Sequence, residues 1–451
     1  MAESNGHFRV VIVGGGIAGL TLALAFERLG INYALLEARE TLEPEYGAGA
    51  GVGLQPNGLR ILDQLGLLEE IEKHTLPLET WMSLDASGRL LATSRTMSMY
   101  RSSLGYSIIF VERRKLLQIL SSRLKNRGSI RTSACVESIE ESDEHVIVRT
   151  SDGLSITADV VVGADGVRSR VRSFIDRMVH NDVDDYMSVK LAAVYGMSSP
   201  TKGIDPGDRF TVYREKANIV GFAGKDGVVF WFVFERLDHS YPLSMCPRYT
   251  ATDAETLCQT VTDVQITPSV RFADLYTNRI VATKMAAEEG VARTWHTRRT
   301  VIVGDAAHKM TPAGGMGANQ AIESVAILVN EIMKAENASS SNRRPSRESV
   351  HSALTRYAEQ RIRESAPAVE RSRTICEALF CNEGPAIPKL RQAFSLSDEE
   401  LLSRVLAEFS RAPILENLAL SPRGIQYEEM ATSVKERTME IAMATQQNGQ
   451  L

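Results

Sequence analysis

Residues 8–40 read FRVVIVGGGIAGLTLALAFERLGINYALLEARE, and this stretch decides the fold. An apolar, strand-like run ends at Val13, and an apolar, helix-like run follows a G-x-G-x-x-G turn made by Gly14, Gly16 and Gly19. This strand–turn–helix layout predicts a Rossmann-type unit that binds a dinucleotide. Gly14 is expected to make the tight turn, Gly16 to let the backbone approach a pyrophosphate, and Gly19 to let helix and strand pack closely.

Glu37 limits which nucleotide fits this turn. It ends the second strand-like run, 18 residues after Gly19 (37 − 19). A carboxylate at this place accepts hydrogen bonds from both ribose hydroxyls and disfavours a 2′-phosphate. The turn is therefore expected to hold the adenosine half of FAD or NAD rather than of NADP, and later motifs must decide between these two.

Composition limits the class of protein. The chain has 451 residues, enough for two or three domains, and its net charge of −5 with no basic stripe argues against a nucleic-acid binder. No segment offers the roughly 18 uninterrupted apolar residues of a transmembrane helix. The first strand follows the N-terminus too closely for a signal peptide, and the five cysteines form no paired or metal-binding motif. We expect a cytoplasmic protein with small-molecule partners and no metal; the sequence carries no signal for oligomeric state.

The pattern of strands and helices changes along the chain. Residues 57–71 are predicted to form one helix, because their apolar positions recur at helical spacing. The expected fold class is α/β: a Rossmann-type domain with an inserted antiparallel-sheet domain for the substrate and a helical C-terminal region. The predicted limits are 1–182 and 285–335 for the discontinuous Rossmann-type domain, with an inserted hairpin near 80–110; 183–284 for the substrate domain; 336–350 for a polar linker; and 351–451 for the helical region.

Two later motifs point to FAD. Residues 160–172 read VVVGADGVRSRVR, with Asp165 after an apolar strand, and residues 301–324 read VIVGDAAHKMTPAGGMGANQAIES, with Gly304 and Asp305 at a second strand end. With the opening turn, they make the chain similar to the flavin monooxygenases of the para-hydroxybenzoate hydroxylase type. The resemblance covers Val10 to about Lys334. It implies one bound FAD and a nicotinamide co-substrate.

The second motif is expected to hold the flavin end of FAD. By resemblance, Asp305 bonds a ribityl hydroxyl, although an ordinary capping aspartate is the alternative. The turn that contains Gly315 and Gly317 lets the backbone approach the isoalloxazine. The amides of Ala318 and Asn319 begin a helix whose positive end faces the pyrimidine edge of the ring, where it would stabilise the charge of reduced flavin.

Three more residues are expected to contact FAD because of the resemblance. Arg113 matches the Arg-x-x-Leu helix start of the family, with Arg114 as the alternative if the register slips by one. Gly51 lies where family members pass close to the ribityl chain, and a flexible-loop glycine is the alternative. Asp165 is used by the family for FAD and nicotinamide contacts, and capping of the next helix is the alternative role.

The nicotinamide is expected to bind only transiently. The chain has no second G-x-G-x-x-G turn and no room for a separate NADPH-binding Rossmann domain. The resemblance therefore implies that NADPH or NADH visits the enzyme, reduces FAD and leaves.

Further stretches, including GAGAGVGLQPNGLRILDQLG and GKDGVVFWFVFERL, resemble fungal secondary-metabolite monooxygenases that epoxidise prenyl chains in meroterpenoid and indole-diterpene pathways. Many of those enzymes have C-terminal membrane segments, whereas this chain ends in the polar EIAMATQQNGQL, so smaller prenylated alkaloids, quinolones or aromatic polyketides are equally expected. The resemblance also implies peripheral membrane association. The expected function is an FAD-dependent, NAD(P)H-consuming monooxygenase that inserts one atom of O2 into a prenylated or aromatic metabolite, by epoxidation or hydroxylation. A flavin oxidase or dehydrogenase without oxygen insertion is the alternative.

Oxygen transfer benefits from a nearby proton donor. The candidates are Lys190 and Tyr195 on the first strand of the substrate domain and Tyr213 on the next, and we expect one of them to face the flavin. His308 is expected to be structural. Four aromatic residues follow one another closely on a further strand, and half of them are expected to face the pocket: Phe230, Trp231, Phe232 and Phe234.

Overall fold

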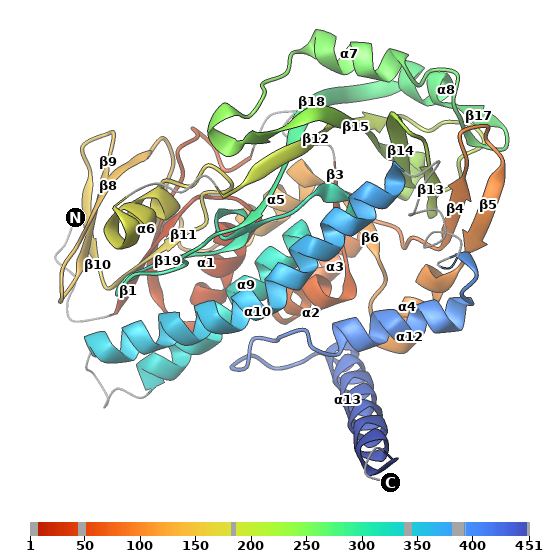
Figure 1. Cartoon of the computed structure of the whole chain (residues 1–451). Helices are drawn as coiled ribbons and strands as arrows, with labels where there is room; N and C mark the ends of the chain where they lie inside the picture. Colours follow the sequence, from red (N-terminus) through yellow and green to blue (C-terminus); the bar gives the residue numbers. More distant parts are fainter. Residues whose placement is uncertain are drawn as a thin grey trace.

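The computed structural model describes residues 8–43, 51–181, 186–337, 345–380, 392 and 394–448, with side chains as far as residue 438. Its first layer is a five-stranded parallel sheet in the order β19-β11-β1-β2-β7 (Figure 1). Helix α1 follows β1 and packs against α9 and α5. The sheet and its helices are made of β1 (Arg9–Val13), α1 (Ile17–Leu29), β2 (Asn32–Leu36), α5 (Arg113–Ser122), β7 (Ile130–Arg131), β11 (Val160–Gly163), β19 (Thr300–Ile302) and α9 (Gly317–Asn337).

The first layer is discontinuous in sequence. Strands β11 and β19 are direct neighbours, with Val161 beside Thr300, although the chain between them builds most of a second sheet. Both strands are buried along their whole length, and a three-stranded sheet contacts the neighbouring strand β1. That three-stranded sheet consists of β8 (Val136–Glu141), β9 (Val146–Thr150) and β10 (Ser155–Ala158).

The second layer is an eight-stranded sheet in the order β20-β18-β12-β15-β14-β13-β4-β5, in which only the β13–β4 pair is parallel. The hairpin predicted near 80–110 pairs with this sheet through Thr80 and Asp208, and not with the parallel sheet. Strand β18 also crosses the predicted limit at 284, so the exact domain limits stay a prediction. The strands are β4 (Thr80–Leu84), β5 (Leu90–Ser94), β12 (Ser188–Ser198), β13 (Asp208–Val212), β14 (Ala217–Ala223), β15 (Val229–Pro242), β18 (Arg279–Val291) and β20 (His308–Lys309).

The two faces of the eight-stranded sheet have different neighbours. Trp231 belongs to a core shared with α7 (Ala251–Gln259) and α8 (Phe272–Thr277). The residues on either side of it belong to a second core on the opposite face, which includes Cys376 and Leu379 of α10 (Arg347–Leu379). The prediction that the aromatic run of β15 divides between two faces is confirmed: Phe230, Phe232 and Phe234 share the second core.

The helix predicted over residues 57–71 is two helices, α2 (Pro56–Gln64) and α3 (Leu68–Glu72). Gly66 lies between them at φ +74°, in the left-handed region that ends helices. The prediction of one helix was therefore wrong, because apolar spacing continues across the break.

Helices make up the C-terminal part of the described chain. Helix α10 packs along α9, and α12 (Asp398–Phe409) and α13 (Pro422–Asn448) follow it. Arg60 of α2 stacks on Tyr427 of α13 at 4.4 Å, which fixes the start of α13, while the remainder of that helix extends away from the body (Figure 1). Most of the predicted linker, at residues 338–344, lies outside the described residues. Within the described chain, no helix combines the length and apolar character that a membrane crossing requires.

Candidate cofactor and substrate cavity

The three glycines of the first turn differ in what surrounds them. A Cβ on Gly14 would lie 2.5 Å from the Ala164 carbonyl oxygen, and one on Gly19 would lie 1.9 Å from the Gly14 carbonyl oxygen. Both clashes are with backbone, so the fold itself requires these two glycines. A Cβ on Gly16 would meet nothing within 4 Å, and Gly16 lines a large cavity. The turn is therefore open at the one glycine where a phosphate can approach the backbone and the N-terminus of α1.

Glu37 holds the turn in place through hydrogen bonds. Its buried carboxylate accepts hydrogen bonds from the Gly15 amide (2.6 Å) and from the Arg39 amide and Nε (both 2.9 Å). Burial opposes ionisation, but these donors together lower the pKa of Glu37 below its ordinary value. Arg39 itself lines the cavity. Contact of Glu37 with a ribose stays a prediction.

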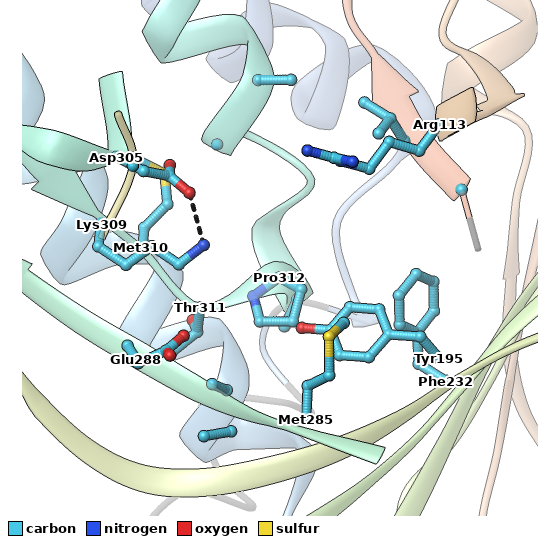
Figure 2. Close-up of a pocket in the computed structure, with 18 of the residues that line it drawn as sticks. Arg113, Tyr195, Phe232, Met285, Glu288, Asp305, Lys309, Met310, Thr311 and Pro312 are labelled. Carbon is cyan, nitrogen blue, oxygen red and sulfur yellow. Dashed lines mark hydrogen bonds and ion pairs between the residues drawn. The ribbon is translucent and has the colours of Figure 1, made fainter. Parts of the chain in front are cut away.

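A cavity of about 820 Å³ begins at this turn and reaches the eight-stranded sheet (Figure 2). Its lining runs from Gly16 past Asp305 and Pro312 to Tyr195 and Phe232. One space thus joins the nucleotide-binding turn to an aromatic face of the second sheet, as expected for a pocket between two layers.

Asp305 faces this cavity beside Lys309. The Lys309 ammonium donates to Asp305 Oδ2 at 2.6 Å, and β20 holds Lys309 opposite Gly290 of β18. Burial acts to raise the pKa of Asp305, but Lys309 and, more weakly, Arg113 lower it, and the net shift is downward. For Lys309, burial opposes protonation, and the pair with Asp305 outweighs it and raises the pKa. Both groups are therefore charged at neutral pH.

Arg113 approaches the cavity from another side. It is the first residue of α5 and follows β6 (Ile109–Glu112) directly. Arg113 lines the cavity, whereas Arg114 is not among the lining residues, and the contact of Arg113 with FAD stays a prediction. Burial lowers the pKa of Arg113. Figure 2 shows its guanidinium pointing into the space opposite Asp305 and Lys309.

The glycine-rich turn before α9 forms the floor of the cavity. Gly315 adopts φ +62° and, with Gly317 and Ala318, lines the space. The Asn319 side chain is buried: its Nδ2 donates to the carbonyl oxygens of Gly53 (3.0 Å) and Gly315 (2.9 Å), so it holds the turn in place. The first amides of α9 have no acceptor within the helix, and its positive end faces the cavity.

Gly51 and Asp165 have structural roles that explain why a glycine and an aspartate occur at these positions. A Cβ on Gly51 would lie 2.3 Å from Phe110 and 2.7 Å from Phe230, although Gly51 also lines the cavity. The Asp165 carboxylate accepts hydrogen bonds from Ser169 Oγ (2.5 Å) and the Arg170 amide (2.8 Å), and so caps α6 (Arg170–His180). Burial raises the pKa of Asp165. Its direct contact with a cofactor stays a prediction.

Only one of the three candidate proton donors lies in the cavity. Tyr195 lines it, and its ring packs edge-on against Phe232 with centroids 5.2 Å apart. Lys190 does not: it occupies an irregularity in the β12 register, is half exposed and lies 3.8 Å from Glu289 Oε1. Tyr213 does not either, because its ring is buried against Phe394. Tyr195 is therefore the candidate that the cavity favours, and the expectation that one of the three faces the flavin stays a prediction.

Lys309 and Glu288 were not predicted as site residues, yet both line the cavity. The signal for Lys309 was its position four residues after Asp305, on a turn short enough to bring the two together. His308 is structural, as expected: it is fully buried and its Nε2 lies 2.7 Å from Ser324 Oγ. Burial and, secondarily, Arg361 lower the pKa of His308 to about 3, so it is neutral.

Comparison with known proteins identifies the family. Residues 7–345 match the family model described as "FAD binding domain". The chain belongs to this family. The FAD-dependent monooxygenase olcE of Penicillium canescens is 37% identical over 376 residues, which cover 82% of this chain and 80% of the relative. The FAD-dependent monooxygenase terM of Tolypocladium album is 38% identical over 334 residues, covering 73% and 70% of the two chains.

Solved structures agree on the fold. Klebsiella pneumoniae HpxO, complexed with FAD and uric acid, superposes with a TM-score of 0.73 at 21% identity, covering 91% of this chain and 98% of that one. A salicylate hydroxylase substrate complex gives 0.70 at 20% identity, covering 95% and 98%. The open turn at Gly16, the positive end of α9 and the charged Asp305 fit FAD. The protein is an FAD-dependent monooxygenase, similar to the fungal enzymes of that name.

Proposed function

We propose that this monooxygenase inserts one oxygen atom into an alkene or aromatic ring of a prenylated or aromatic metabolite held against the second sheet. The observation that carries the proposal is the single cavity that joins the Gly16 turn to Tyr195 and Phe232. Bound FAD would supply the redox chemistry that activates O2, with the nicotinamide as reductant. The chain supplies the binding, the orientation and the dry surroundings that this chemistry needs.

The proposed cofactor contacts follow the length of the cavity. Gly16 and the start of α1 hold the pyrophosphate, and Asp305, kept ionised by Lys309, accepts a hydrogen bond from the ribityl chain. Gly315 and the first amides of α9 meet the flavin ring. Arg113 contributes positive charge from the opposite side.

The proposed substrate face is aromatic. Phe222 stacks on Phe110 with centroids 4.4 Å apart, and Phe232 stacks on Phe234 at 5.9 Å. Such a wall favours isoprenoid chains and flat rings, because it removes their apolar surface from water. Tyr195 lies beside this wall, and its hydroxyl has no hydrogen-bond partner among the described residues, so it is free to donate to oxygen or substrate.

Rapid mixing tests the proposal. The purified enzyme is reduced anaerobically with NADPH and then mixed with oxygen, first alone and then with a panel of prenylated phenols and indoles, while flavin absorbance and product mass are recorded. The proposal expects bleaching, a transient absorbance band before reoxidation, and a product that carries one 18O atom from 18O2.

Two other outcomes are informative. Bleaching followed by direct reoxidation, with every panel member dehydrogenated or unchanged and no 18O incorporated, would support the alternative of a flavin oxidase or dehydrogenase. The matched variant Asp305→Ala should lose FAD on gel filtration while the wild type retains it. Equal retention by both proteins would contradict the assignment of Asp305 to the cofactor.

A further inference from the structure

The glycine-rich turn before α9 is held from two sides. We name residues 311–317 the ring turn, because the flavin ring is expected to lie against them. On one side, Gln55 Nε2 donates to the carbonyl oxygens of Gly314 (3.2 Å) and Gly315 (3.3 Å). On the other side the ring turn packs on α10, which begins after the residues that the family model matches. The second support therefore comes from a part of the chain outside that model.

Ser372 of α10 makes this second support. Its Oγ donates to the Thr311 carbonyl oxygen at 2.6 Å, and Thr311 Oγ1 donates to the Ser372 carbonyl oxygen at 3.0 Å. Ser372 is 1% exposed and Thr311 is 2% exposed. Thr311 precedes Pro312, and both line the cavity (Figure 2). A reciprocal, buried pair of hydrogen bonds thus fixes the start of the ring turn to one residue of α10.

The Ser372 hydroxyl does not follow the usual behaviour of a hydroxyl in a helix. Such a group commonly donates to the carbonyl four residues earlier, as Thr374 of the same helix does to Glu370 at 3.0 Å. Ser372 donates across to the ring turn instead. It is also packed there, because a Cβ on Gly314 would lie 3.1 Å from its Oγ. Both the hydrogen bond and the small size of serine therefore serve the ring turn.

Loss of this hydroxyl would act on the cofactor site from outside the cavity. Ser372 is not among the residues that line the cavity, so it reaches the site only through the ring turn. Without its donor, the buried Thr311 carbonyl oxygen would lack a hydrogen bond, and a shift of the turn would relieve that cost. The ring turn leads into the first amides of α9, whose dipoles stabilise negative charge only at close range.

We propose that Ser372 is a positioning residue for the flavin. By fixing Thr311, it sets the distance from the ring turn to the isoalloxazine, and with it the preference of the site for reduced over oxidised FAD. The inference rests on the proposed placement of the flavin ring against this turn, and it adds a residue of α10 to the machinery of the site.

Two serines of α10 provide a matched test. Ser365 lies two helical turns before Ser372 and is 0% exposed, and its hydroxyl has no partner among the described residues. Hydrogen–deuterium exchange is measured on the apoprotein for the peptide that spans residues 311–317, and the midpoint potential of bound FAD is measured against a redox dye. In Ser372→Ala, exchange in this peptide should be about tenfold faster. The preference for reduced FAD should fall about tenfold, which lowers the midpoint potential by about 30 mV. Ser365→Ala should keep both wild-type values.

Further variants decide how Ser372 acts. Thr311→Val combined with Ser372→Ala should shift the potential no further than the larger single shift, because both changes break one reciprocal pair. If Ser372→Ala does not fold, Ser372→Cys keeps the volume with a weaker donor and should show the same faster exchange.

Three results would overturn the role of Ser372: wild-type exchange or potential in its variants, equal shifts in Ser365→Ala, or additive shifts in the double variant. A wild-type protein that takes up no FAD would instead overturn the proposed function.

Discussion

Lys309 decides the charge of the residue that we expect to meet the ribityl chain. Its ammonium lies 2.6 Å from Asp305 Oδ2. The other charged or titratable side chains around this pair are those of Arg113, His308, Tyr195 and Glu288. Lys309 offsets the effect of burial and keeps the pKa of Asp305 below its ordinary value. A carboxylate in a cavity of low polarity would otherwise take up a proton.

Lys309→Met should therefore weaken FAD binding in a pH-dependent way. Without the ammonium, the pKa of Asp305 rises, and the carboxylate is lost as the pH falls through that new value. The dissociation constant of FAD, measured by quenching of flavin fluorescence on apoprotein, should increase about tenfold near pH 6 and less near pH 8. The exposed Lys190 gives the control: Lys190→Met should keep the wild-type constant at both pH values. A pH-independent loss in Lys309→Met would contradict the role of charge.

Tyr195 gives the second prediction at this scale. Burial raises the pKa of its hydroxyl, so the phenol keeps its proton across the neutral range and can serve as a donor there. Tyr195→Phe should lower the rate of oxygen insertion about 100-fold and increase peroxide release, while the rate of flavin reduction stays unchanged. The ratio of product to NADPH consumed measures this effect.

The control for Tyr195 is another tyrosine of the same sheet. Tyr213 is buried and lies outside the cavity, so Tyr213→Phe should keep the wild-type ratio of product to NADPH. If Tyr195→Phe also kept that ratio at every pH between about 6 and 9, the donor would have to be another group.

The sequence predicted the residues whose neighbours lie close in the chain. The roles of Gly14 and Gly19 in the turn follow from local spacing, and the Asp305 side chain faces the cavity as its strand-end position suggested. The sequence could not predict that Lys190 lies outside the cavity, because one irregularity in the β12 register turns its side chain away. Nor could it show that the Arg209 guanidinium lies between the rings of Trp81 and Phe222, because that arrangement depends on the pairing of β4 with β13, which are far apart in the chain.

At the scale of elements, the turn between β1 and α1 combines a folding requirement with an expected binding role. A side chain on Gly19 would collide with the Gly14 carbonyl oxygen at 1.9 Å, whereas one on Gly16 would enter open space. Gly16 also has φ −82°, a value that any residue adopts. The two positions can thus be separated by substitution, although both belong to one motif.

Gly16→Val should fold normally but bind FAD poorly, because its side chain occupies the space where the pyrophosphate is expected. Its urea midpoint as apoprotein should lie close to that of the wild type, and its FAD content after purification should fall below about one tenth of the wild-type content. Gly19→Val should fail to fold and give little soluble protein. A Gly16→Val protein that retains full FAD would refute the assignment of this turn.

Individual strands and helices were easier to predict than the pairing between strands. Strand β15 and its alternating faces follow from residue types alone. The joining of the β4–β5 hairpin to the second sheet does not, because its partner β13 lies more than 100 residues away and no local signal specifies the pairing. Gly66 was the sequence signal for the break between α2 and α3. It was overlooked because the apolar spacing continues on both sides of it.

At the scale of the whole molecule, helix α10 joins the two layers. One stretch of it packs on α9, where buried Arg361 pairs with Glu323 at 3.2 Å. Further along, the Arg373 Nε donates to both carboxylate oxygens of Glu289 on β18, each at 3.0 Å. Glu289 is only 2% exposed, and it lies next to a residue of the cavity wall, Glu288. The helix therefore couples the flavin floor to the substrate sheet.

Arg373→Met tests this coupling. Among the described residues, the remaining ion-pair partner of the buried Glu289 would be Lys190, at 3.8 Å, and breaking a buried pair in this way costs about 3 kcal/mol. We expect the unfolding free energy to fall by about that amount, and the displaced β18 to release more peroxide per NADPH consumed while FAD content stays high. Arg373→Lys should recover most of the stability. The control Arg298→Met breaks a pair with Asp143 that is more than half exposed on both sides, and should cost less than about 1 kcal/mol. If Arg373→Met lowered stability without raising peroxide release, α10 would support the fold but would not set the position of the cavity wall.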